Sequence, residues 1–144
     1  MGPDPRSLSR PTLCRCGAAA DADYANHEAA LDVLARPRLR LVIPALIIAE
    51  VCYLIDSNLG AEAEAQSLAS LSHFDVQAPF PEEWPRIAKL VRILADFPLG
   101  GADASVIVLA ERLRTDRVIT FDRRHFRTVQ PRHCKRFRLL PDDE

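Results

Sequence analysis

Apolar positions along the chain follow two spacings, one typical of strands and one typical of helices. Short β-rich runs predict strands at 39–43, 74–78, 117–121 and 137–140. Longer stretches with helical spacing predict helices at 24–35, 45–58, 61–71, 81–96 and 102–114. Strands that alternate with helices indicate an α/β domain with helices on the faces of a sheet.

The first residues break this pattern. Prolines and arginines interrupt every apolar period before Gly17, and residues 14–17 favour neither a strand nor a helix. We therefore expect an irregular N-terminal segment at 1–17, without a first strand, and a single domain over 18–144.

Composition narrows the class of protein. Apolar residues make up 48% and charged residues 27% of the chain, which excludes a disordered or collagen-like protein. No apolar run approaches the roughly 20 residues that a membrane span needs, and the N-terminus carries no secretory signal. Four cysteines without metal-site spacing indicate neither a disulfide scaffold nor a structural zinc site. We expect a cytoplasmic protein without membrane association.

Charge is unevenly distributed although the net charge is only −1. Between Arg112 and Arg138 the chain has ten Lys or Arg residues and two acids. Such a basic segment suggests an anionic partner, with phosphate the commonest candidate. A solvated face that balances acids elsewhere is the alternative. As RNA-binding residues we expect Arg123, Arg124 and Arg127, with His125 between them contacting phosphate or packing.

Three acids stand where the local pattern is otherwise apolar. Glu50 is the single charge in an all-apolar stretch of the 45–58 helix, and such a helix is expected to be buried. Asp103 heads the apolar stripe of the 102–114 helix, and Asp122 directly follows the 117–121 strand. Each has an ordinary alternative: an arginine pair or solvated gap for Glu50, helix capping for Asp103, and a turn for Asp122.

Taken together, the three acids suggest carboxylates from separate elements that converge on one pocket. Carboxylates that cluster repel one another, and a hard cation such as Mg²⁺ or Mn²⁺ relieves that repulsion. A metal–carboxylate pocket near an arginine-rich segment indicates hydrolysis of phosphodiesters.

The stretches that carry these acids resemble known motifs. They read Ile43-Pro-Ala-Leu-Ile-Ile-Ala-Glu50, Leu99-Gly-Gly-Ala-Asp103 and Arg117-Val-Ile-Thr-Phe-Asp122-Arg-Arg-His-Phe. In order and spacing they resemble the second, third and fourth motifs of PIN-domain ribonucleases, specifically the VapC-type toxins of bacterial toxin–antitoxin pairs. The resemblance covers about residues 24–140.

This resemblance implies a Mg²⁺-dependent endoribonuclease (Mn²⁺ being the other candidate ion) with a three-layer fold, in which helices flank a central, mostly parallel sheet. It implies that Glu50, Asp103 and Asp122 are catalytic and bind the metal, with Thr120 supporting the site. It also implies an RNA substrate, a VapB-type antitoxin and a homodimer.

One motif of the family is not matched. Family members open with an apolar strand that ends in a metal-binding Asp followed by Ser or Thr. Counting back from the first helix places this Asp near positions 7–10, where the sequence reads Ser7-Leu8-Ser9-Arg10. Either the residues before Gly17 come from a shifted reading frame, or the protein has lost its first strand. We therefore expect impaired cleavage.

Two alternatives to an active nuclease remain open. The first is a catalytically inactive PIN-like protein that retains its contacts with antitoxin or RNA. The second is an unrelated α/β domain, in which the acids cap helices and form ion pairs. An apolar strand ending in Asp-Ser or Asp-Thr in another frame of the upstream DNA would favour the nuclease.

Overall fold

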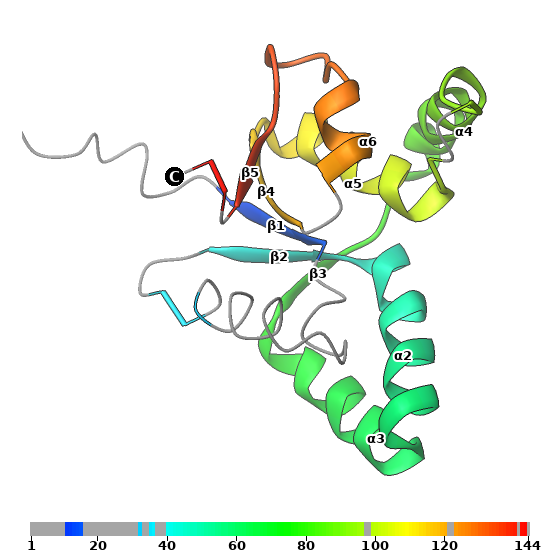
Figure 1. The fold of residues 1–144 in the computed structure, drawn as a ribbon, viewed down its shortest axis with the longest axis vertical. Coiled ribbons are helices and arrows are strands. Elements are labelled where there is room, and N and C mark those ends of the chain that lie inside the picture. The colour runs from blue at the N-terminus through cyan, green and yellow to red at the C-terminus, as the bar shows by residue number, and fades with distance from the viewer. Residues whose placement is uncertain are drawn as a thin grey trace, which may run out of the picture.

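The computed structural model describes residues 11–15, 32, 35–36, 40–96, 99–120, 123–140 and 142–143. Within these ranges, a five-stranded sheet has the order β3-β2-β1-β4-β5, and all neighbouring strands are parallel (Figure 1). The strands are β1 (Thr12–Arg15), β2 (Leu41–Pro44), β3 (Asp75–Gln77), β4 (Arg117–Thr120) and β5 (Arg138–Leu140). The helices are α2 (Ala45–Leu59), α3 (Ala61–Ser70), η2 (Leu71–His73), η3 (Pro81–Glu83), α4 (Trp84–Ile93), α5 (Gly101–Leu113) and α6 (Arg123–Thr128).

The predicted α/β class with a central parallel sheet is confirmed. Each predicted strand is present within a few residues of its expected position, and four of the predicted helices correspond to α2, α3, η3 with α4, and α5. The predicted helix at 24–35 lies, except for residues 32 and 35, outside the described residues. The sequence does not predict the short helix α6, because its basic residues directly after a strand are equally typical of a turn.

The expectation of an irregular segment without a first strand is wrong for Thr12–Arg15, which forms the central strand β1. This strand pairs with β2 on one side and β4 on the other, and Leu13 is completely buried. The Thr12 amide donates to the Arg40 carbonyl at 2.8 Å, and the Thr115 hydroxyl donates to the Pro11 carbonyl at 2.6 Å. Contacts from distant parts of the chain therefore hold a strand that its own sequence does not favour.

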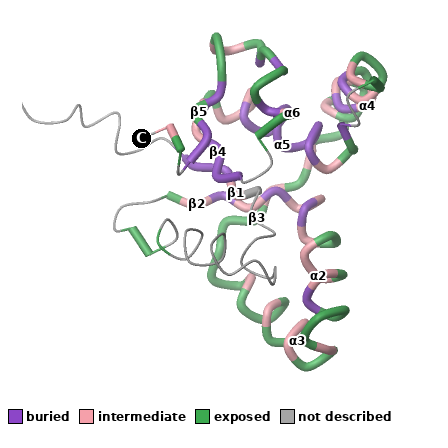
Figure 2. The backbone as a smooth tube through the Cα atoms, in the orientation of Figure 1, coloured by how far each residue is buried: buried purple, intermediate pink, exposed green. Residues whose placement is uncertain are grey.

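The core is densest around α5. Every residue of this helix from Asp103 to Ala110 is buried (Figure 2). The helix packs against α4 on one side and against β1 and β2 on the other, so its apolar residues are covered all round. Ile87 and Leu90 of α4 are part of the same core. This packing fixes the position of α5 and of the acid in its first turn.

The expectation that α2 is a buried helix is wrong. In α2 only Ile47 and Ile55 are buried, Glu50 is exposed, and Tyr53 keeps 73% of its surface in contact with solvent. The helix contacts α3, β2 and α5, which leaves much of its surface uncovered in the described part of the chain. It ends at Gly60, whose φ of 87° suits a residue without a Cβ atom.

No helix in the described ranges is both long enough and apolar enough to span a membrane.

Candidate active site

The candidate site lies at one edge of the parallel sheet. The carboxyl ends of parallel strands share an edge, and in open α/β sheets ligands bind there. At this edge β2 runs directly into α2, and β4 is followed closely by α6. The N-terminal half of α2, the end of β4 and the start of α6 therefore surround the same end of the sheet (Figure 1).

Asp103 is a buried acid near this end of the sheet, and its role in a site stays a prediction. It stands in the first turn of α5, and only 7% of its surface is exposed. The first turn of a helix carries unpaired amide groups and the positive end of the helix dipole, which favour a carboxylate there. Gly100 and Gly101 precede it, and a Cβ atom at either position would meet no other atom within 4 Å.

His125 lies beside Asp103. Its Nδ1 atom is 3.5 Å from the Asp103 Oδ2 atom, and both side chains are almost fully enclosed. The short helix α6 places this ring, because Phe126 is buried and packs edge-on against Phe137. The sequence suggested phosphate contact or packing for His125, and its contact with the acid was missed. A signal was present, since the apolar Phe126 next to it is typical of an ordered helix rather than a loose turn.

Thr120, the predicted supporting residue, ends β4 and is buried. Its backbone is paired in register with Arg15 at the end of β1. The central strand and the strand that leads to α6 therefore finish side by side at the edge where the site is expected.

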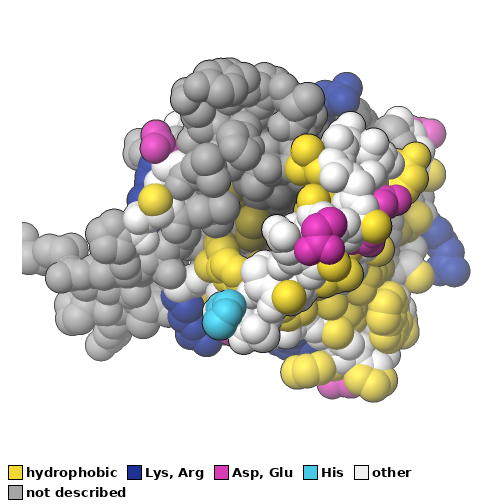
Figure 3. Space-filling model, turned by 90° about the horizontal axis from the view of Figure 1, so that it is seen from below, with side chains coloured by type: hydrophobic (Ala, Val, Ile, Leu, Met, Phe, Trp, Pro, Cys, Tyr) yellow, Lys and Arg dark blue, Asp and Glu magenta, His cyan; other side chains and the backbone are white. Residues whose placement is uncertain are grey.

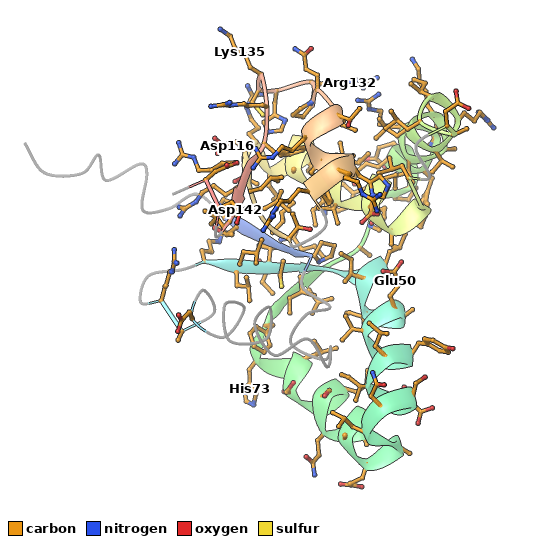
Figure 4. All side chains as sticks on the ribbon, viewed as in Figure 1. Glu50, His73, Asp116, Arg132, Lys135 and Asp142 are labelled. Atoms are coloured by element: carbon orange, nitrogen blue, oxygen red, sulfur yellow. The ribbon has the colours of Figure 1, made fainter. Side chains whose placement is uncertain are left out.

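Glu50 comes from a neighbouring element. It lies in the N-terminal half of α2, near the end of the sheet from which this helix starts (Figure 4). Because α2 packs against α5, Glu50 and Asp103 stand on two helices in contact. Glu50 is exposed, so the burial expected for the helix around it is not observed at this residue. The convergence of its carboxylate with that of Asp103 stays a prediction.

Asp122, the third predicted acid, lies outside the described residues. Its neighbours in the described chain are Thr120 and Arg123, the last residue of β4 and the first of α6.

The arginines expected to bind RNA lie on α6, and all three are exposed. Arg123 forms an ion pair with Asp142, and Arg127 forms an ion pair with Asp143. The basic segment of the sequence is therefore partly balanced by acids of the chain's own C-terminal residues.

The donor chemistry at this edge fits a hard divalent cation. Glu50 and Asp103 offer carboxylate oxygens, which Mg²⁺ and Mn²⁺ prefer. Among the described residues, however, no group of three His, Cys, Asp or Glu side chains is close enough to form a complete metal site. The third candidate ligand, Asp122, lies beyond those residues.

Comparison with known proteins identifies the family of this chain. Residues 18–130 match the PIN domain. The chain therefore belongs to the PIN-domain family, as its acidic motifs suggested. It is also 32% identical over 123 residues to Ribonuclease VapC26 of Mycobacterium tuberculosis (strain ATCC 25618 / H37Rv), an alignment that covers 84% of this chain and 91% of that protein. The resemblance to VapC-type ribonucleases is thus confirmed.

Proposed function

We propose that this protein is a divalent-metal-dependent endoribonuclease, the toxin of a cytoplasmic toxin–antitoxin pair, with strongly reduced activity. The observation that supports this most directly is the buried carboxylate of Asp103 at the carboxyl edge of the sheet, next to His125. Its similarity to a VapC ribonuclease over most of both chains supports RNA as the substrate.

Each candidate residue has a distinct role in this proposal. Glu50, Asp103 and Asp122 hold Mg²⁺ or Mn²⁺, which when bound activates water and offsets charge on the phosphate. Thr120 lines the site from the end of β4. Arg123, Arg124 and Arg127 bind the RNA backbone, because guanidinium groups match phosphate in charge and shape. His125 orients the Asp103 carboxylate from the side.

The end of β1 supports the proposal of reduced activity. The strand reads Thr12-Leu13-Cys14-Arg15, so it brings no carboxylate to the edge where Thr120 ends β4. The family's first aspartate would come from this strand, and without it the metal has one fixed ligand fewer.

The same observation favours a second candidate function, a PIN-domain protein that binds RNA or an antitoxin without cleaving RNA.

Protein partners are part of the proposal. Hydrophobic side chains gather on the face seen in Figure 3, and the exposed large apolar residues of α2 and α3 include Tyr53, Leu59 and Leu68. Exposed apolar surface of this kind often marks an interface with another protein. A VapB-type antitoxin and a second copy of the chain in a homodimer are the partners that we propose.

Cleavage of a labelled RNA with Mg²⁺ and with EDTA tests the enzyme. We expect slow cleavage that EDTA stops, and a further loss of about a hundredfold in Asp103→Asn, because one ligand of the metal is weakened. The exposed Asp56, in the second half of α2, provides the control Asp56→Asn. Equal cleavage by Asp103→Asn, or cleavage that survives EDTA, contradicts the proposal. RNA binding without any cleavage supports the second candidate.

A further inference from the structure

One face of α6 is bound to the C-terminal residues of the chain. Arg123 and Arg127 are four residues apart, so they lie on the same side of this helix. Arg123 Nη2 donates to Asp142 Oδ1 at 3.0 Å, and its Nε pairs with the other oxygen of that carboxylate. Arg127 donates from both terminal nitrogens to Asp143, at 2.9 and 3.1 Å. Both arginines therefore hold a carboxylate through two nitrogens.

The backbone fixes these carboxylates in place. The chain turns back after β5, and the Asp143 amide donates to the Leu139 carbonyl at 2.8 Å. The Asp143 side chain accepts the Leu139 amide at 2.9 Å, and Leu139 is buried in the core. Asp143 is thus attached to the edge strand of the sheet, and Figure 4 shows Asp142 beside that strand.

Charge strengthens this interaction at neutral pH. The hydrogen bonds from Arg127 and from the Leu139 amide lower the pKa of Asp143 below its ordinary value of 3.8. A depressed pKa means that the interaction is present at and above that ordinary value and is lost as the pH falls through the lower, folded value. Asp143 therefore faces Arg127 as an anion under physiological conditions.

The interaction is nevertheless open to exchange. The side chains of Arg123 and Arg127 are 47% and 43% exposed, so a ligand in solution can reach them. Exposed ion pairs of this kind are weak and are screened by salt. The paired hydrogen bonds that each guanidinium makes with a carboxylate are also those it would make with a phosphate group.

We propose that Asp142 and Asp143 act as a built-in competitor of the RNA backbone at Arg123 and Arg127. This inference rests on the proposed function, since it assumes that RNA is the substrate. On the other side of the same short helix, His125 contacts Asp103, so the competition takes place next to the candidate active site. The C-terminal acids thereby lower the affinity of the free protein for RNA.

Neutralising the two acids tests this competition. Asp142→Asn with Asp143→Asn removes both charges, while the asparagine amide oxygen at 143 can still accept the Leu139 amide. Fluorescence anisotropy with a labelled single-stranded RNA gives the affinity over a range of salt concentrations. We expect about threefold to tenfold tighter binding at low salt. The log–log salt dependence should steepen by about 0.7 for each additional phosphate that the protein neutralises.

Two matched variants separate competition from simple charge. Asp56→Asn with Glu62→Gln removes two charges from exposed positions on α2 and α3, at the opposite end of the molecule from α6 in Figure 1. Arg123→Ala with Arg127→Ala removes the proposed binding groups. Neutralising Asp142 and Asp143 should increase the RNA affinity more than the α2–α3 control does. The increase should disappear when the same two changes are made together with Arg123→Ala and Arg127→Ala. Thermal unfolding of each variant checks that the fold is kept.

The outcomes distinguish this inference from the proposed function. An equal increase in affinity in the α2–α3 control, an increase that persists without the arginines, or no increase at all overturns the competition. If the competition is overturned in this way but RNA binding falls in Arg123→Ala with Arg127→Ala, the proposed contact between these arginines and RNA still stands. If no variant binds RNA, both proposals are contradicted.

Discussion

At the scale of single residues, the contact between Asp103 and His125 is the feature most closely tied to chemistry. A carboxylate enclosed by protein has a high desolvation cost unless neighbouring groups compensate it. The first turn of α5 presents the positive end of its helix dipole to this carboxylate, and the ring of His125 lies 3.5 Å away. A ring at 3.5 Å also restricts the orientations of the carboxylate, which matters for a group that is proposed to hold a metal.

Replacing His125 tests this role. We expect His125→Ala to weaken Mn²⁺ binding by about tenfold, because partners that orient a metal ligand typically contribute about 10- to 100-fold. Electron paramagnetic resonance of free Mn²⁺ measures the affinity without reference to cleavage. His125→Asn, whose amide can still reach toward Asp103, should recover part of the loss. The exposed His73 provides the control His73→Ala. Equal Mn²⁺ affinity in parent and His125→Ala would show that the ring only packs.

At the scale of elements, α2 and α5 show why sequence predicts part of this fold. The sequence predicts a buried helix from the all-apolar stretch of α2, and an apolar stripe along α5. The difference is in what covers them: α5 lies between α4 and the sheet, whereas α2 has no such cover on its outer side in the described part of the chain. Whether Glu50 is exposed depends on which distant elements of the chain cover α2, so its exposure could not be predicted from the local pattern.

Strand β1 illustrates the same limit from the other direction. Only Thr12 of its four residues is of a type enriched in strands, and the strand follows a proline and ends in Arg15, so local propensity gives little support for a strand. Pairing on both sides decides its structure, and those partners begin 29 and 105 residues further along the chain at Leu41 and Arg117. By contrast, the acid of α5 was predicted because the apolar stripe that it heads is local. Local patterns therefore predicted α2 to α5 and the position of Asp103 on the apolar stripe of α5, but not β1, α6 or the contact between Asp103 and His125.

The link between α5 and the segment after β3 has a testable energetic role. Arg112 of α5 pairs with Glu83 of η3, donates to Gln77 and the Ala78 carbonyl, and lies 3.8 Å from the centre of the Phe80 ring. We expect Arg112→Ala to lower the free energy of unfolding by about 2–3 kcal/mol, because it leaves the largely enclosed Glu83 carboxylate without this partner. Urea denaturation measures the change.

The matched control is Arg92→Ala, an exposed arginine on α4 that should change stability by less than about 0.5 kcal/mol. Adding Glu83→Gln to Arg112→Ala should cost less than the sum of the two single changes, because the two side chains interact directly. Additive costs would mean that the ion pair does not contribute.

At the scale of the whole molecule, the PIN-domain match and the structure overlap only in part. The match covers residues 18–130, whereas the central strand β1 precedes this span and the edge strand β5 follows it. The three predicted acids fall inside the matched span. The sequence placed the family's first acid near positions 7–10, whereas we propose that the end of β1, also outside the matched span, takes this position. The overall fold is therefore that of the family.

Restoring an acid at the end of β1 tests the proposed loss of activity. Arg15 pairs in register with Thr120, so an aspartate at position 15 stands at the edge where the metal is expected. We expect Arg15→Asp with Cys16→Ser to raise Mg²⁺-dependent RNA cleavage by about a thousandfold, which corresponds to about 4 kcal/mol of transition-state stabilisation. Arg15→Asn with Cys16→Ser removes the arginine without adding a carboxylate and should leave cleavage slow. The proposal is contradicted if the unchanged chain cleaves RNA strongly, EDTA stops this cleavage, and Glu50→Gln abolishes it. The remaining acids would then suffice, because the metal would be held in a reactive position without a ligand from β1.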